Sequence, residues 1–487
     1  MKKPTISKLF LYRHRYGIGY FFLFILFVAL VFLMPLISPD GLSEAEMSSA
    51  VDSHALTWQS MTEGNIVDLP YHALQHVSIS FFGLTEYAIK LPSIVISLAL
   101  GVLIILLLNR WFKNNVAIIA SILVVLSAPF LYLAGSGIPL IMLVFWPTLL
   151  LWLGSKINGK TIAKTIYMFF FAICLLLSLF TPYLIYFAIF IVFYALVHPH
   201  LRFMIKSIPK IPFILTTLAV IGVVAVLGYE IFKYPTVSDQ LFLAKNFSWN
   251  NFFPNISDAF LPFFSWSGNV QSVFLSPMIG LASIALAFTG LISTAKGFFA
   301  SRNSIASIFI VFTVIVSGFN PSAAVLIIIP FAILTAHGIR YILEKWYGLF
   351  PENPYARIFG LIPISAFLGI MIISSISHFT FGYRYNPIVA DEFHNDLSLF
   401  RENIEPGTTI LIPAGTLSYD FYKILESKGQ YIVTSNTPST QDKENIQKIA
   451  TLGKWPAKLP YDLSKIICSP KSTDSDRIYL YEDKGNN

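Results

Sequence analysis

Residues 90–109 read KLPSIVISLALGVLIILLLN, an apolar run that decides the class of fold. A helix of about 20 apolar residues crosses the roughly 30 Å hydrocarbon core of a bilayer. The whole chain of 487 residues has the same character, with 55% hydrophobic residues, 12% charged residues and a mean hydropathy of +0.68. This composition excludes a water-soluble enzyme of this length and a disordered chain. It predicts an all-α polytopic membrane protein.

Similar apolar runs recur along the chain and predict about eleven transmembrane helices. Residues 165–198 are interpreted as two helices, because one helix of that length is too long for a single crossing and Thr181-Pro182 offers a break. The predicted spans are 17–37, 90–109, 115–133, 138–154, 165–181, 183–198, 212–231, 276–294, 304–319, 322–340 and 358–378.

The distribution of Lys and Arg predicts the orientation, because cytoplasmic loops of membrane proteins are enriched in both. With a cytoplasmic N-terminus, the basic segments 2–15, 110–113, 156–164, 202–210, 296–302 and 340–357 all lie inside. Before residue 400 the outer segments carry only Lys90, Lys233, Lys245 and Arg384. We therefore expect a multi-pass plasma-membrane protein whose C-terminal domain is extracytoplasmic. The net charge of +7 reflects these loops, so no nucleic-acid partner is expected.

Two domains are expected. Residues 1–380 form the transmembrane domain, with a first extracytoplasmic loop at 38–89, and residues 390–487 form a small extracytoplasmic α/β domain. In the tail, strand-like runs at 409–413, 431–434 and 477–481 alternate with helical patterns at 418–427 and 441–452. The two cysteines, Cys174 and Cys468, imply no disulfide framework.

The first loop carries acids directly after the first span. Asp40, Glu44 and Glu46 surround Ser43, which is expected to cap a helix that starts at Glu44 and runs towards Trp58. In such a helix Glu44 and Glu46 point about 200° apart, so only one of them can face a cleft. The alternative is that these acids only favour the helix dipole.

The loop then leads into the second span through a recognisable order of residues. The elements in this order are Ser43-Glu44, Asp68-Leu69-Pro70, Phe82-Gly83, Glu86, Ala88, Lys90 and Leu91-Pro92-Ser93. In their order and spacing they resemble the first loop and second span of C-type (GT-C) membrane glycosyltransferases, a family that includes protein mannosyltransferases and lipid A aminoarabinose transferases.

The resemblance implies transfer of a sugar, with inversion, from a polyprenyl-phosphate-linked donor to a glycan, lipid or protein acceptor at the extracytoplasmic membrane face. Membrane lipids are further partners. Such chemistry needs a carboxylate as general base, and the resemblance implies Glu44, or Asp40 or Glu46 under a shifted alignment. The chain departs from the family at Ser43, where an acid is usual, and at Asp68, where Lys or His is usual.

Several side chains are candidates for substrate binding. Lys90 and Arg384 could bind the donor phosphate, and Tyr383 flanks Arg384. The alternatives are snorkelling for Lys90 and an interfacial belt for the Tyr-Arg-Tyr stretch. His72 and His76 share a helix face and could contact the sugar or phosphate, or could be plain interfacial histidines. No metal site and no cofactor are predicted, with a divalent metal as the open alternative.

Two other classes of function stay open. The number of spans and the basic balance also suit a flippase or transporter for lipid-linked glycans, although such a path requires polar residues that the span cores lack. The acid missing at Ser43 also suits a non-catalytic membrane scaffold.

Overall fold

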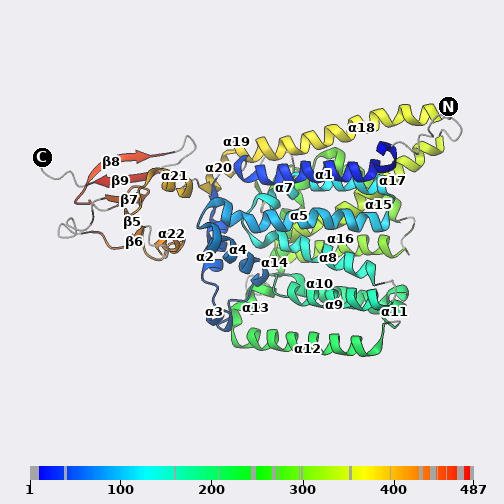
Figure 1. Cartoon of the computed structure of the whole chain (residues 1–487), viewed down its shortest axis with the longest axis horizontal. Helices are drawn as coiled ribbons and strands as arrows, with labels where there is room; N and C mark the ends of the chain where they lie inside the picture. The colour runs from blue at the N-terminus through cyan, green and yellow to red at the C-terminus, as the bar shows by residue number, and fades with distance from the viewer. Residues whose placement is uncertain are drawn as a thin grey trace.

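A computed structural model describes most of the chain and shows a helical bundle with a small sheet at one end (Figure 1). The described residues are 10–37, 41–157, 161–206, 208–242, 248–265, 270–271, 274–295, 297, 300–349, 354–394, 396–426, 431–438, 446, 448–456, 458–468 and 477–482.

The long helices lie side by side, with α12 at one edge of the bundle and α18 at the other (Figure 1). Helix α1 begins at the end of the bundle opposite the C-terminal sheet (Figure 1). The bundle helices are α1 (Phe10–Ile37), α5 (Glu86–Trp111), α6 (Asn114–Val125), α7 (Ala128–Gly135), α8 (Met142–Lys156), α9 (Thr161–Ser178), α10 (Leu184–Val197), α11 (Pro199–Lys206), α12 (Lys210–Lys233), α15 (Leu281–Ala295), α16 (Ser301–Phe319), α17 (Ile328–Leu349) and α18 (Pro354–Ser377).

The apolar helices make this an integral membrane protein. Within the described residues, six helices are long and apolar enough to cross a membrane, or up to seven if the bent pair α6 and α7 forms one span. The other predicted spans coincide with shorter apolar helices in α1, α9, α10 and α15. The total of eleven spans therefore stays a prediction. The predicted break at Thr181-Pro182 is confirmed, because α9 ends at Ser178 and α10 begins at Leu184.

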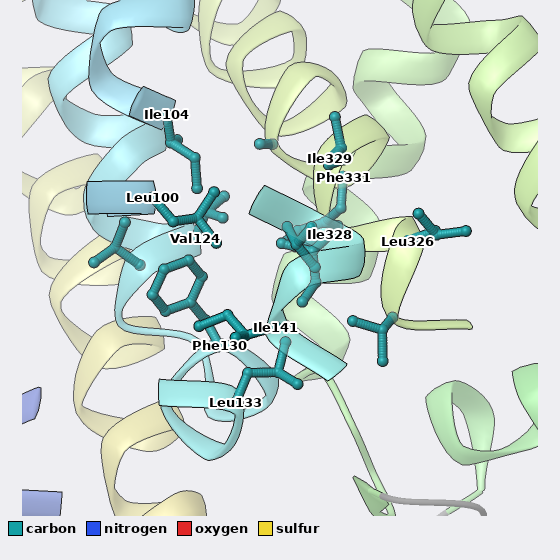
Figure 2. Close-up of a cluster of buried hydrophobic side chains, with 14 of the residues drawn as sticks. Leu100, Ile104, Val124, Phe130, Leu133, Ile141, Leu326, Ile328, Ile329 and Phe331 are labelled. Atoms are coloured by element: carbon teal, nitrogen blue, oxygen red, sulfur yellow. The ribbon is translucent and has the colours of Figure 1, made fainter. Parts of the chain in front are cut away.

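The bundle is held by apolar packing to which several helices contribute. Leu100, Val124, Phe130, Ile141 and Ile328 come from α5, α6, α7, the 3-10 helix η2 (Pro139–Ile141) and α17, and all lie in one buried cluster (Figure 2). Since lipid tails are as apolar as these side chains, close packing rather than a hydrophobic driving force stabilises such contacts.

A five-stranded mixed sheet forms most of the C-terminal part, in the order β6-β5-β7-β9-β8. Its strands are β5 (Thr409–Leu411), β6 (Ile432–Thr434), β7 (Lys448–Leu452), β8 (Asp462–Ile467) and β9 (Ile478–Glu482). β5 pairs in parallel with β6 and β7, and α22 (Leu417–Glu426) follows β5. The predicted helix at 441–452 is wrong for residues 448–452, which form β7: pairing with β5 and β9 overrides the local preference.

The sheet end is packed onto the helices of the first loop. Phe400 and Tyr422 share a buried cluster with Met47 and Ala50. The guanidinium of Arg401 donates a hydrogen bond of 2.9 Å to the Leu84 carbonyl. In addition, β1 (Leu42–Ser43) pairs with β4 (Phe393–His394). The C-terminal part therefore fixes the position of the first loop.

Helices α15 and α17 approach each other at two glycines, which gives a test of the packing. A methyl group on Gly290 would collide with the Leu334 carbonyl, whereas nothing lies within 4 Å of the corresponding position on Gly222 in α12. Gly290→Ala is expected to destabilise the protein by about 1–3 kcal/mol, because backbone cannot move aside cheaply. Gly222→Ala should not destabilise it. Thermal unfolding of both variants in nanodiscs checks this, and equal unfolding midpoints would contradict the close packing.

Candidate functional site

The first loop folds into three short helices at the end of the bundle that faces the sheet (Figure 1). They are α2 (Glu44–His54), α3 (Trp58–Thr62) and α4 (Leu69–Phe82). The predicted cap is confirmed: Ser43 Oγ accepts from the Glu46 amide, and the Glu46 side chain accepts from the Ser43 amide. The helix predicted to run from Glu44 towards Trp58 ends at His54, and Trp58 begins α3.

Glu46 is buried, with 1% of its surface exposed, and its carboxylate links two backbone segments. Its Oε2 accepts from the Ser43 amide at 2.9 Å, and its Oε1 accepts from the Gly137 amide at 2.6 Å. Both oxygens thus bind backbone N–H groups, and such charge-assisted bonds are strong ones. Glu46 therefore attaches the start of α2 to the loop that precedes η2.

Glu44 is the first residue of α2 and is exposed, so its carboxylate faces outward. Lys90 is fully buried, and its Nζ donates to the Gly41 carbonyl at 2.8 Å. This bond holds the segment just before α2 against α5. Asp40, the other acid predicted here, lies outside the described residues.

One further acid, Glu392, lies near Glu44 and Glu46 and was not predicted from the sequence. Glu392 ends α20 (Pro387–Glu392) and directly precedes the strand that pairs with β1. Burial, and then the nearby charges of Glu46 and Glu44, raise the pKa of Glu392 above its usual value. The start of α2 and the end of α20 thus place three carboxyl groups near enough for their charges to interact.

His72 and His76 both lie on the face of α4 that packs on α2. His72 Nδ1 lies 2.7 Å from Ser53 Oγ, and His76 Nδ1 lies 2.8 Å from the Ser53 carbonyl. Burial lowers the pKa of His72 to about 4, so its imidazole is neutral at physiological pH.

Within the described part of the chain, no group of three or more His, Cys, Asp or Glu side chains could hold a metal.

Gln75 is the centre of the network between α2 and α4. Its Nε2 donates to the carbonyls of Ile89 and Gly137, which directs Oε1 towards Ser49 Oγ and Ser53 Oγ at 2.8 and 2.6 Å. Because both serines must donate to Oε1, Ser53 Oγ accepts from His72 Nδ1–H. This network joins α2, α4, α5 and the segment at Gly137 through fully buried polar groups.

Tyr383 and Arg384 lie in a short helix, α19 (Tyr383–Tyr385), after α18. Tyr383 is buried, its hydroxyl accepts from the Leu275 amide at 3.0 Å, and its ring stacks on Tyr132 with 5.0 Å between centroids. Arg384 is exposed, with its guanidinium 5.9 Å from the Tyr385 ring. Neither residue lines the cavity described next.

A cavity of about 410 Å³ lies between α2, α4, η2, α8 and the break between α9 and α10. One face of α2 lines it, because Ala45, Ser48, Ser49 and Asp52 follow helical spacing. Glu44 and Glu46 do not line it. The volume lies within the range of small-molecule sites. Its polar lining includes Asp52, Asn65, Asp68, His72, Thr181 and Gln240 of α13 (Pro235–Phe242).

Asp68 stands out among the lining residues. It holds the N-cap position of α4, yet its side chain makes no capping hydrogen bond. It is 8% exposed, and its Oδ1 has no hydrogen-bond partner among the described residues. Burial raises the pKa of Asp68 to about 8. Thr181 Oγ1, 2% exposed at the residue level, has no such partner either.

The backbone is strained on both sides of this cavity. Asp68 has φ 52° and Tyr183 has φ 65°, and in the described ranges no other residue except glycine has a positive φ. An aromatic residue in this region is unusual, and each such residue costs on the order of 1–3 kcal/mol. The Asp68 amide donates to the Phe180 carbonyl at 2.7 Å, which ties the two strained segments together. Strain of this kind concentrates at binding and active sites.

The comparisons with known proteins concern the fold. No protein-family model and no curated protein sequence matches the chain. The structure of ArnT from Cupriavidus metallidurans bound to undecaprenyl phosphate matches with a TM-score of 0.52 and 13% identity, over 95% of this chain and 98% of that one. The apo form of the same protein matches with a TM-score of 0.52 and 12% identity, over 96% and 98%.

A second protein shares the fold. The oligosaccharyltransferase of Archaeoglobus fulgidus, solved with a tethered acceptor peptide, matches with a TM-score of 0.50 and 11% identity, over 90% of this chain and 69% of that one. The predicted resemblance to C-type membrane glycosyltransferases is thereby confirmed at the level of the fold.

Glu44 and Glu46 differ in environment, and this predicts different effects on stability. Glu46→Gln places an NH₂ group against a backbone N–H, so about 2 kcal/mol of stability should be lost. Glu44→Gln changes an exposed side chain, and its effect should stay within about 0.5 kcal/mol. Thermal unfolding of the two variants beside wild type measures the difference. A Glu46→Gln protein as stable as wild type would show that the hydrogen bonds of Glu46 to the Ser43 and Gly137 amides do not stabilise the fold.

The raised pKa of Asp68 predicts a pH-dependent stability. Between about pH 4, where an unfolded Asp ionises, and about pH 8, the folded state holds a proton that the unfolded state has released. Asp68 therefore lowers the stability by about 1.4 kcal/mol per pH unit as the pH rises through this window. Asp68→Asn should gain stability over wild type from pH 5 to pH 8. Parallel pH profiles of the two proteins would show that Asp68 titrates normally.

Proposed function

We propose that this membrane protein transfers a sugar from a polyprenyl-phosphate-linked donor to an acceptor at the extracytoplasmic membrane face. The observation that carries the proposal is the fold shared over 95% of the chain with a protein solved bound to undecaprenyl phosphate. The cavity between α2, α4 and the break after α9, with strained backbone beside it, supports the proposal, since it offers room and hydrogen-bonding groups for a sugar ring. The acceptor can be a glycan, a lipid or a protein.

In the proposed reaction the acceptor hydroxyl attacks the anomeric carbon of the donor. A bond from that carbon to the acceptor oxygen forms, and its bond to the phosphate oxygen breaks. The polyprenyl phosphate leaves with the electron pair, and the hydroxyl proton passes to a carboxylate. Glu44 is the proposed base, because it is exposed to an incoming acceptor, whereas both oxygens of Glu46 already bind backbone N–H groups.

The departing phosphate needs cationic partners. Arg384 is the stronger of the two proposed ones, because its guanidinium is exposed. Lys90 would have to exchange its bond to the Gly41 carbonyl for one to the phosphate. Tyr383, His72 and His76 then act by holding α19, α2 and α4 in place.

Donor consumption tests this proposal. Purified protein in nanodiscs is given a panel of polyprenyl-phosphate sugars and a membrane extract as acceptor, and loss of donor is followed by mass spectrometry. Wild type should consume one donor, and Glu44→Gln should be slower by about 100-fold or more, as expected for loss of a general base.

Asp258→Asn supplies the matched control, an exposed acid on α14 (Trp249–Phe264) changed to its amide. It should react like wild type. If wild type consumes no donor, the proposed transfer is contradicted. If Glu44→Gln reacts as fast as an active wild type, Glu44 is not the base.

A further inference from the structure

The cavity beside Asp68 contains acids and neutral polar groups but no Lys or Arg among the described residues that line it. Asp52 and Asp68 stand on opposite elements, α2 and the start of α4. No Lys or Arg among the described lining residues faces these two carboxyl groups, and burial raises the pKa of both. A phosphate or a carboxylate brought here would lose its hydration and find no positive partner.

The groups that do line the cavity suit hydroxyls. Asn65 and Gln240 bring amides that both donate and accept, and Thr181 brings a hydroxyl without a partner. The carboxyl of Asp68 can donate when protonated and accept when ionised. A ligand rich in hydroxyl groups is the kind that satisfies such a set, and leaving the buried groups of Asp68 and Thr181 unpaired is costly.

Both orphaned polar atoms belong to the two strained segments. Oδ1 of Asp68 and Oγ1 of Thr181 are buried, and Asp68 forgoes the capping bond that its position on α4 would allow. The backbone bond from Asp68 to Phe180 fixes the spacing of these segments. The strained segments thus hold the unpaired Oδ1 of Asp68 and Oγ1 of Thr181 at the wall of one cavity.

We propose that this cavity binds a sugar ring that carries no negative charge, held by hydrogen bonds to Asp68 and Thr181, and that it rejects anionic sugars and phosphate. The source of the ring, donor or acceptor, rests on the proposed function. The phosphate of a lipid-linked donor stays outside the cavity, towards cationic side chains elsewhere. The resemblance in the first loop implies Lys or His at the position of Asp68. Asp68 thereby changes the local preference from anions to uncharged or cationic groups.

The test measures binding of simple glycosides to the full-length protein in nanodiscs by saturation-transfer NMR. The probes are the methyl glycosides of glucose, mannose and arabinose as neutral rings, of glucosamine as a cationic ring, and of glucuronic acid as an anionic ring. At least one neutral or cationic probe should bind, and methyl glucuronide should bind at least tenfold more weakly than methyl glucoside or not at all. The probe that binds best tells a neutral from an amino sugar.

Two near-isosteric variants locate the binding. Asp68→Asn and Thr181→Val should each weaken binding of the best probe by about tenfold or more, as expected for loss of a buried hydrogen bond. Asp258→Asn should bind like wild type. The inference is overturned if no neutral or cationic probe binds, if methyl glucuronide binds as tightly as methyl glucoside, or if both variants bind like wild type.

The donor-consumption assay separates this inference from the proposed function. Consumption of donor by wild type, together with glycoside binding that ignores Asp68 and Thr181, overturns the inference alone. Glycoside binding that depends on Asp68, without consumption of any donor, supports the inference and contradicts the proposed transfer. Competition by the intact donor, but not by the acceptor extract, identifies the donor as the source of the ring.

Discussion

The structure around the candidate site depends on one buried carboxylate. Glu46 accepts backbone hydrogen bonds from Ser43, at the start of α2, and from Gly137, ahead of η2. Because both of its oxygens accept backbone hydrogen bonds, Glu46 stabilises the observed rotation of α2 about its axis. That rotation turns Ala45, Ser48 and Asp52 towards the cavity, and Met47 and Ala50 towards the C-terminal part of the chain. Gln75 reinforces the same arrangement from α4 through carbonyls of Ile89 and Gly137.

This arrangement separates two chemical environments on one helix. Around the first turn of α2 lie Glu44 and Glu392, close to the surface, with the buried Lys90 holding the preceding segment. Along its side lies a cavity lined by the buried Asp68 and the exposed Asp52, with no Lys or Arg among its described lining residues. The proposed reaction, which breaks the bond between an uncharged ring and a charged phosphate, suits two such neighbouring environments. The strained backbone at Asp68 and Tyr183 lies at the cavity, and such strain is common at binding sites.

Much of the fold could be predicted from the sequence, because apolar runs of membrane length leave few alternatives. The cap at Ser43 and the break at Thr181-Pro182 could also be predicted, because each depends on residues that are adjacent in the sequence. Strand β7 was missed, because its partners lie elsewhere in the chain. In the site, Asp68 was noticed only as the loss of a cation. Its contact with the segment at Thr181 arises from tertiary packing that no local pattern encodes, although an Asp before Leu-Pro at a helix start was a visible signal.

The central claim is that a clamped α2 and a strained Asp68 hold a cavity for an uncharged or cationic sugar ring at the end of a C-type glycosyltransferase fold. The most direct measurement is a cryo-electron microscopy structure of the protein in nanodiscs with an unreactive polyprenyl-phosphonate sugar. The account predicts ring density against Asp68 and Thr181, with the phosphonate outside the cavity. Phosphonate density inside the cavity, or a ring bound elsewhere while the cavity stays without ligand density, would contradict it.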